Sequence, residues 1–354
     1  MNILITIDLS AGKWINGLFQ NTFFLAQMLK AIGYNVGLVV HHGKSSCKFG
    51  KEFPIFELDD LNNLKNIDVL MQASWIAPNN IISNFLLNNT NCKNIHIHYG
   101  NKMIGDIEDC KSTKECITPF LTDEVWISPH FSFSKQYYEC YYNCKVRIIP
   151  YIWSDFFIKQ EEVKANNRDK TLFYDPEKEM GLCVLESNIT FLKNCIPPIM
   201  IYDYVFNNYD ISQFLSVFCA GHLCDKKYFK TWLQGLNSHA NKKIAFYDRH
   251  DPSYIFGQNN FGVISHQILC GLNYSYLESL YLGVPILHNS KHFKDCGFFY
   301  KNYDINDAGE KLFNMINTYN DKFDTYTSKN KDIIKKYSPE NQEVINHYKQ
   351  IINT

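Results

Sequence analysis

The sequence of 354 residues contains no uninterrupted apolar run that approaches the roughly 18 residues needed to span a membrane. Its first residues, MNILITIDLS, form a strand pattern and lack the basic segment and small-residue cleavage site of a signal peptide. The net charge of −1 shows no overall excess of the positive charge that attracts nucleic acid. We therefore expect a cytoplasmic protein with no transmembrane segment and no nucleic-acid partner.

The sequence also lacks the residue spacings of common metal sites. Its 12 cysteines never form a C-x2-C pair, so a structural zinc site is not expected and most of them should be buried, reduced thiols. No Asp-x-Asp motif follows an expected strand, and the neighbouring Asp59 and Asp60 fall in an expected loop. We expect no metal site and no bound cofactor.

A dinucleotide fingerprint is missing as well. Gly12 and Gly17 lie between an expected strand (residues 3–7) and an expected helix (18–32), but their spacing is not that of G-x-G-x-x-G. No acidic residue ends the next strand (36–40), where His41 stands instead. We therefore reject a nicotinamide site. The glycine loop is either an ordinary connection or, as a resemblance described below implies, a segment near an acceptor or a phosphate group.

Strand and helix patterns alternate along the chain, which is typical of α/β folds with parallel sheets. The length and the 45% hydrophobic content suit two domains, and a charged, Asn-rich stretch at about 155–170 predicts the linker between them. We expect Rossmann-like domains over 1–155 and 170–320, with C-terminal helices over 321–354 that include a helix at 339–352. Further strands are expected at 69–72, 95–98, 125–127, 146–150, 217–219 and 244–247, and a further helix at 228–236.

Residues 261–290, FGVISHQILCGLNYSYLESLYLGVPILHNS, predict a strand at 263–265, a helix from about 272 that ends at Gly283, and a strand at 284–287. In such units ligands bind beyond the carboxyl ends of the strands, where helix N-termini present free N–H groups. Polar residues gather at that end: His266, Gln267, Asn273, Tyr274, Glu278, His288 and Asn289. The alternative is a packed helix with a solvated Glu278 and histidines that only end strands.

The same stretch resembles the nucleotide-sugar half-site of GT-B glycosyltransferases, in which a Glu followed five and seven residues later by Gly and Pro binds ribose. Here those residues are Glu278, Gly283 and Pro285. The resemblance is closer to a poorly characterised group of GT-B-like bacterial proteins with the pattern HQ…LNY.Y.E.L.LG.P..HNS. A second motif of that group matches Glu186, Asn188 and Lys193, with Ser187 in place of its Pro.

The resemblance implies a GT-B fold, with two doubly wound α/β domains facing across a cleft. It also implies sugar transfer from a UDP-, GDP- or dTDP-linked donor to a hydroxyl acceptor, with a growing glycan expected. Lys193, on the first helix of the second domain, and Arg249 would contact the diphosphate together with the helix start at Asn273. Backbone groups between Gln267 and Leu272 would meet the base.

Three further points stay open at this stage. A general base in the first domain could be His98, Asp106 or His130. The acidic residue that a large retaining family has eight positions before its ribose Glu is Cys270 here, so retention and inversion are both possible. A catalytically inert GT-B-like protein that binds a glycan or a nucleotide sugar, and a nucleotide-sugar epimerase, are the alternative functions.

Overall fold

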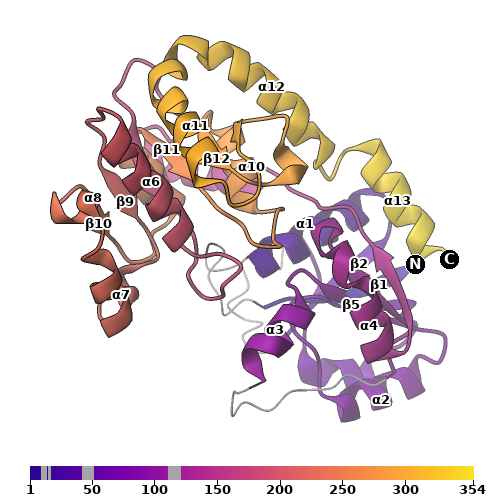
Figure 1. Ribbon diagram of the computed structural model, residues 1–354. Coiled ribbons are helices and arrows are strands. Elements are labelled where there is room, and N and C mark those ends of the chain that lie inside the picture. Colours follow the sequence, from indigo (N-terminus) through magenta and orange to yellow (C-terminus); the bar gives the residue numbers. More distant parts are fainter. Residues whose placement is uncertain (9–13, 15–16, 42–51, 111–120) are drawn as a thin grey trace. The chain divides into compact units, whose positions relative to one another are not determined.

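The computed structural model describes residues 1–8, 14, 17–41, 52–110 and 121–354 (Figure 1). The chain divides into two compact units. Unit 1 consists of Met1–Ser154 together with Tyr337–Thr354, and unit 2 consists of Asp155–Lys336. The C-terminal segment therefore belongs to the same unit as the N-terminus.

Unit 1 contains a seven-stranded sheet in the order β3-β2-β1-β4-β5-β6-β7, in which neighbouring strands are parallel. Strands β4 and β6 are buried along their whole length, as expected for a parallel sheet covered on both faces. The strands are β1 (Asn2–Thr6), β2 (Asn35–Val40), β3 (Ile55–Glu57), β4 (Val69–Gln72), β5 (Lys93–His98), β6 (Glu124–Ile127) and β7 (Lys145–Ile148).

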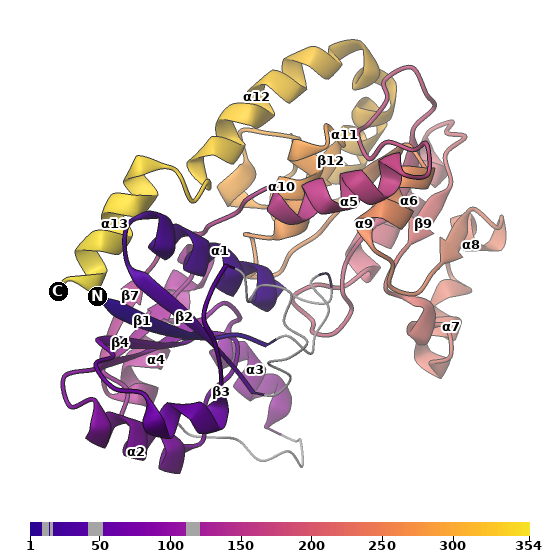
Figure 2. The same ribbon diagram turned by 180° about the vertical axis from the view of Figure 1, so that it is seen from behind.

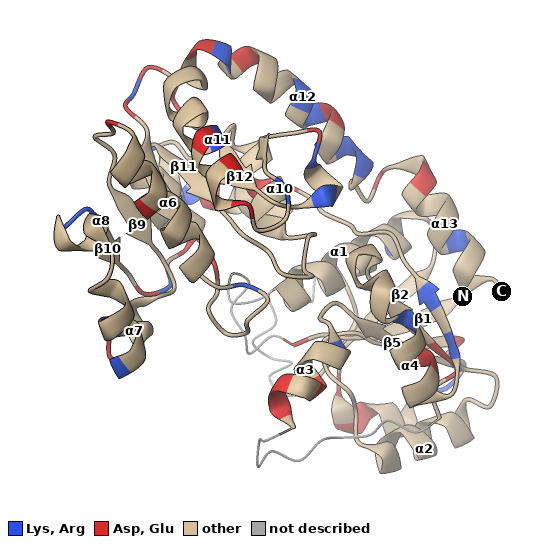
Figure 3. Ribbon diagram, viewed as in Figure 1, with Lys and Arg blue, Asp and Glu red and all other residues tan. Residues whose placement is uncertain are grey.

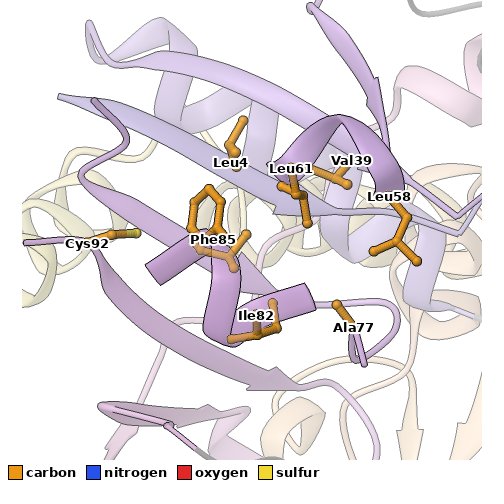
Figure 4. Close-up of a cluster of buried hydrophobic side chains, with 9 residues drawn as sticks. Leu4, Val39, Leu58, Leu61, Ala77, Ile82, Phe85 and Cys92 are labelled. Carbon is orange, nitrogen blue, oxygen red and sulfur yellow. The ribbon is translucent and has the colours of Figure 1, made fainter. Parts of the chain in front are cut away.

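Helices pack on the sheet of unit 1 through apolar side chains. Figure 4 shows one such layer, where Phe85 and Ile82 of α2 lie beside Leu61 and face Leu4 and Val39 of the sheet. Burial of these side chains stabilises the layer because it removes apolar surface from water. The helices of unit 1 are α1 (Gly17–Ala31), α2 (Asn79–Asn88), α3 (Lys102–Asp109), α4 (Lys135–Tyr142) and α13 (Gln342–Ile352).

Helix α13 lies beside β7 (Figure 2), and Arg147 of β7 donates to the Thr354 hydroxyl just beyond the helix at 2.9 Å. The Tyr348 hydroxyl donates to the Pro150 carbonyl at 2.9 Å. The expected start of this helix at Pro339 is wrong, because α13 begins three residues later. Asn341 is its N-cap, with Oδ1 accepting from the Glu343 N–H at 2.8 Å, and this satisfies a helix donor that would otherwise be unpaired.

Unit 2 contains a six-stranded parallel sheet in the order β10-β9-β8-β11-β12-β13. This is the 3-2-1-4-5-6 order of doubly wound nucleotide-binding folds. The order reverses between β8 and β11, which are neighbours although their first residues, Gly181 and Phe261, lie 80 positions apart in the sequence. The strands are β8 (Gly181–Val184), β9 (Leu215–Val217), β10 (Ile244–Phe246), β11 (Phe261–Ile264), β12 (Ile286–His288) and β13 (Phe298–Phe299).

The stretch expected to be a linker forms a helix instead. Helix α5 buries one side through the apolar residues Phe157, Ile158 and Ala165, together with Glu161. A helical pattern of buried residues therefore lies within the charged, Asn-rich stretch. Both signs of charge occur along the outer helix α12 (Figure 3). Within the described residues, no helix is long and apolar enough to cross a membrane. The helices are α5 (Phe156–Asn166), α6 (Ile196–Asn208), α7 (Lys227–Leu233), α8 (Asn237–Ala240), α9 (Pro252–Gln258), α10 (Tyr274–Tyr281), α11 (Ile305–Thr318) and α12 (Phe323–Lys336).

Candidate functional site

The carboxyl ends of β8 and β11 form the switch point of the unit 2 sheet, where ligands of doubly wound folds bind. The loops that follow these two strands are joined by an isolated antiparallel bridge between Lys193 and Gln267. A further backbone bond runs from the Ile268 N–H to the Leu192 carbonyl at 3.0 Å. The structure thus brings the two sequence motifs, around residues 186–193 and 266–278, into direct contact.

A buried carboxylate connects these loops. Glu186 is 3% exposed, and its Oε2 accepts from Gln267 Nε2 at 2.7 Å. Its Oε1 accepts from the Ser265 hydroxyl and from the His266 N–H. The Ser265 hydroxyl is also 2.9 Å from the hydroxyl of Tyr276. Both oxygens of Glu186 are therefore engaged in holding the β11 loop, and a part for Glu186 in donor binding stays a prediction.

Burial dominates the electrostatics of Glu186 and raises its pKa to about 7, although the hydrogen bonds from Ser265 and Gln267 and the charge of Lys193 oppose the change. Lys193 also acts on Cys270, whose thiol pKa is raised by burial and lowered by this lysine. Lys193 is half-buried. Its ammonium is thus directed to a protected cluster that includes Glu186 and Cys270, unlike a solvated surface lysine.

The expected position of Lys193 on a helix is wrong. Lys193 lies in an extended loop, and α6 begins only at Ile196. Pro197 and Pro198 occupy the first turn of α6, where their missing N–H groups are tolerated. A helix that began near residue 188 would place both prolines in its interior, where they would clash with the preceding turn.

Three non-glycine residues with left-handed backbone follow three neighbouring strands of this sheet. Asn188 (φ 56°) follows β8, Cys219 (φ 58°) follows β9, and Leu269 (φ 54°) follows β11. The Asn188 side chain holds two of these loops, because Nδ2 donates to the Cys219 carbonyl at 3.1 Å and Oδ1 accepts from the Cys195 N–H at 2.8 Å. Strained backbone of this kind gathers at functional sites, where the surrounding contacts maintain it.

Arg249 follows β10 at the same end of the sheet. Burial raises the pKa of the Cys219 thiol, the charge of Arg249 lowers it, and the charge of Glu186 raises it. Arg249 is therefore close to Cys219. Arg249 and Lys193 therefore both lie close to the loops that follow β8 and β9. Two cationic side chains near these neighbouring loops suit an anionic ligand.

The predicted helix of the second motif is confirmed as α10, with Asn273 as its N-cap. Leu277 and Leu280 are buried, as expected, while Glu278 is half-buried. Gly283 ends the helix with φ 69°, and the Val284 N–H donates to the Ser279 carbonyl at 2.8 Å, which completes a Schellman motif. The N-terminus of α10 thus follows the loop that carries Gln267.

The remaining motif residues mainly shape the loops after β11 and β12. Asn289 accepts from the Gln267 N–H at 2.8 Å and donates to its carbonyl at 3.0 Å. His288 accepts from the Ser290 N–H at 3.2 Å through Nδ1 and donates to the Cys296 carbonyl at 3.0 Å through Nε2. Its pKa is lowered to about 4 by burial, so it is neutral at pH 7.

Three other residues of the motif, His266, Leu272 and Tyr274, are buried. His266 Nδ1 is 2.7 Å from the Tyr300 hydroxyl, and burial lowers the pKa of His266 to about 4. Tyr274 is buried at the start of α10, and the side chain of Leu272 is buried just before it. Contact of these residues with a donor stays a prediction.

The possible general bases lie in unit 1. His98 is the last residue of β5, its Nε2 is 2.9 Å from the Tyr142 hydroxyl, and burial lowers its pKa to about 3. Asp106 is paired with Lys102 at 2.7 Å and accepts from the Tyr137 hydroxyl. Burial makes His98 a weak base at neutral pH. The contacts with Lys102 and Tyr137 engage the Asp106 carboxylate.

The remaining candidates in the N-terminal half of the chain are His130, Gly12 and Gly17. His130 is 8% exposed and packs against the rings of Phe131 and Tyr151. Gly17 is the exposed first residue of α1, and Gly12 lies outside the described residues. Among the residues that the structure describes, no group of three or more His, Cys, Asp or Glu side chains could hold a metal ion.

Sequence reasoning missed Ser265, Tyr276 and Tyr300, which complete the polar network around Glu186 and His266. Ser265 is the last residue of the strand expected at 263–265, and Tyr276 occupies one position of the family pattern. A polar residue at the buried end of a parallel strand was the available signal, since such a group needs a partner.

The chain belongs to the family described as "Protein of unknown function (DUF2827)", which matches residues 3–352. No curated protein matches the chain. Among solved structures, a glycosyltransferase from Rickettsia africae ESF-5 is similar with a TM-score of 0.60 at 14% identity, over 99% of this chain and 97% of that chain.

Two further solved structures are similar over almost their whole length. An alpha-glucosyltransferase in complex with UDP and a 13-mer DNA has a TM-score of 0.63 at 12% identity, over 100% of both chains. The catalytic domain of starch synthase IV from Arabidopsis thaliana, bound to ADP and acarbose, has a TM-score of 0.62 at 10% identity, over 99% of this chain and 98% of that chain. At these identities the likeness shows the fold, which is GT-B with two Rossmann-like domains.

Proposed function

We propose that this protein transfers a sugar from a nucleotide-diphosphate donor to a hydroxyl acceptor. The observation that carries the proposal is the meeting of the two motifs at the switch point of unit 2, where Lys193 bridges to Gln267 and a buried Glu186 holds both loops. The similarity to glycosyltransferases solved with UDP or ADP supports the same function.

The chemistry of sugar transfer explains the residue types at this site. Departure of the sugar leaves negative charge on the diphosphate, and groups that are fixed before the reaction neutralise this charge best. Lys193, Arg249 and the N–H groups at the start of α10 would supply this stabilisation. Glu278, one turn into α10, would accept hydrogen bonds from the two ribose hydroxyls of a UDP, GDP or dTDP donor.

The finer features of the function belong to the same proposal. Because two cationic side chains and a helix N-terminus would meet the diphosphate, transfer of a hexosyl or related sugar would need no divalent metal and no cofactor. The acceptor would be a glycan hydroxyl. A cytoplasmic location is supported by the ten free cysteines of the described residues, since thiols persist in reducing compartments.

One experiment separates the proposal from its alternatives. The purified protein is incubated with UDP-, GDP- and dTDP-sugars, with and without glycan acceptors, and both nucleotide release and sugar products are followed. Acceptor-dependent nucleotide release supports sugar transfer. A changed sugar still attached to its nucleotide would indicate an epimerase, whereas binding without any product would indicate an inert GT-B-like binding protein.

A further inference from the structure

The amide of Gln267 is held in one orientation by its neighbours. Nε2 donates to Glu186 Oε2 at 2.7 Å and approaches the Ser265 hydroxyl at 3.4 Å. Oε2 accepts in either protonation state of Glu186, because a proton on the carboxyl group can reside on Oε1, which contacts the Ser265 hydroxyl. The NH2 group of Gln267 therefore faces Glu186, and its oxygen must point elsewhere.

That oxygen is an unsatisfied acceptor. Gln267 is 5% exposed, and its Oε1 is buried with no hydrogen-bond partner among the residues that the structure describes. A buried carbonyl without a donor is unfavourable, by about 1–3 kcal/mol, and such atoms in folded proteins call for an explanation. Oε1 is accordingly a place where a ligand that carries a hydrogen-bond donor would gain affinity.

The position of Gln267 indicates which part of a donor it would meet. Residues opposite each other in an antiparallel bridge carry their side chains on the same face, so Gln267 and Lys193 lie side by side. Phosphate oxygens only accept hydrogen bonds, so the acceptor Oε1 does not suit the diphosphate itself. A hydroxyl group can donate to Oε1, and hydroxyls flank a diphosphate in a nucleotide sugar.

We propose that Gln267 is a specificity-determining residue that accepts a hydrogen bond from a hydroxyl of the transferred sugar, next to the diphosphate at Lys193. The inference rests on the proposed function, in which Glu278 already meets the ribose. Glu186 is then a positioning residue that orients the Gln267 amide. Because Oε1 is covered, the loop after β11 must shift locally to admit the sugar.

The test compares nucleotide sugars with nucleotides in calorimetric titrations of wild type and Gln267→Met, which keeps the length of the side chain and removes the acceptor. We expect the variant to bind the nucleotide sugar about tenfold more weakly, as for loss of one buried hydrogen bond, and to bind the nucleoside diphosphate as wild type does. Gln258→Met, at an exposed position at the end of α9, is the matched control and should change neither affinity.

A second measurement does not depend on the folding of the variant. Wild type is titrated with a series of donors that each lack one sugar hydroxyl, and one member should bind about tenfold more weakly than the parent sugar. If Gln267→Met folds, it should bind this same member about as tightly as it binds the parent nucleotide sugar. Equal binding of the whole series to wild type would overturn the inference, as would equal loss of nucleotide and nucleotide-sugar binding in Gln267→Met. Failure of wild type to bind any nucleotide sugar would instead contradict the proposed function.

Discussion

Replacement of Glu186 by Gln should change how the stability of the protein depends on pH. Burial raises the pKa of Glu186 from its ordinary value of 4.5 to about 7. Between these two values the folded chain binds more protons than the unfolded chain, so the free energy of unfolding falls as the pH rises. A pKa difference of this size corresponds to about 3 kcal/mol, at about 1.4 kcal/mol for each pH unit.

Gln cannot titrate, so Glu186→Gln should lack this contribution. We expect the unfolding free energy of wild type, relative to the variant, to be higher at pH 5 than at pH 8 by up to about 3 kcal/mol. Urea unfolding followed by circular dichroism at both pH values measures the difference, and other titrating groups cancel in the comparison. Glu177→Gln, at an exposed position, is the control and should give the same difference at both pH values. A Glu186→Gln difference that does not change with pH, or that changes in the opposite direction, would refute the account of a buried carboxyl group that resists ionisation.

Three further predictions concern activity and the α10 helix. Lys193→Ala should lower kcat by an amount that corresponds to about 2–4 kcal/mol of lost transition-state stabilisation, with a smaller effect on donor binding. An unchanged kcat in steady-state kinetics would show that Lys193 is only a surface group. Activity should persist in EDTA, and full loss of turnover restored by magnesium or manganese would contradict metal independence. Gly283→Ala should destabilise the fold by at least about 1–2 kcal/mol in urea unfolding, because φ is 69° and the new Cβ would lie 3.1 Å from Phe323; wild-type stability would contradict the helix end described above.

Much of the fold follows from local patterns in the sequence. The strand expected at residues 69–72 coincides with β4, and Gly33 and Gly283 end α1 and α10 with positive φ, as predicted. These features depend on buried apolar runs and on a backbone conformation that glycine adopts readily. Short edge strands were missed, because β3 and β13 have only three and two residues and little internal pattern.

The candidate site was predictable only in part. The sequence indicated two motifs, but their contact through Lys193 and Gln267 depends on strand order, which brings β8 beside β11. Residue types also could not show that both oxygens of Glu186 are engaged within the protein while Gln267 Oε1 is not. Hydrogen bonding between distant segments decides which polar side chains hold loops and which can meet a ligand.

The most direct test of the donor site is calorimetric titration of UDP, GDP and dTDP into wild type and Glu278→Ala. A carboxylate that accepts hydrogen bonds from ribose hydroxyls contributes roughly 1.5–3 kcal/mol for each bond. The variant should therefore bind the preferred nucleotide at least about tenfold more weakly, while circular dichroism shows that its fold survives. Glu310→Ala, at an exposed position on α11, should bind as wild type does. Equal affinity of wild type and Glu278→Ala for a nucleotide that binds would contradict the placement of the donor at α10.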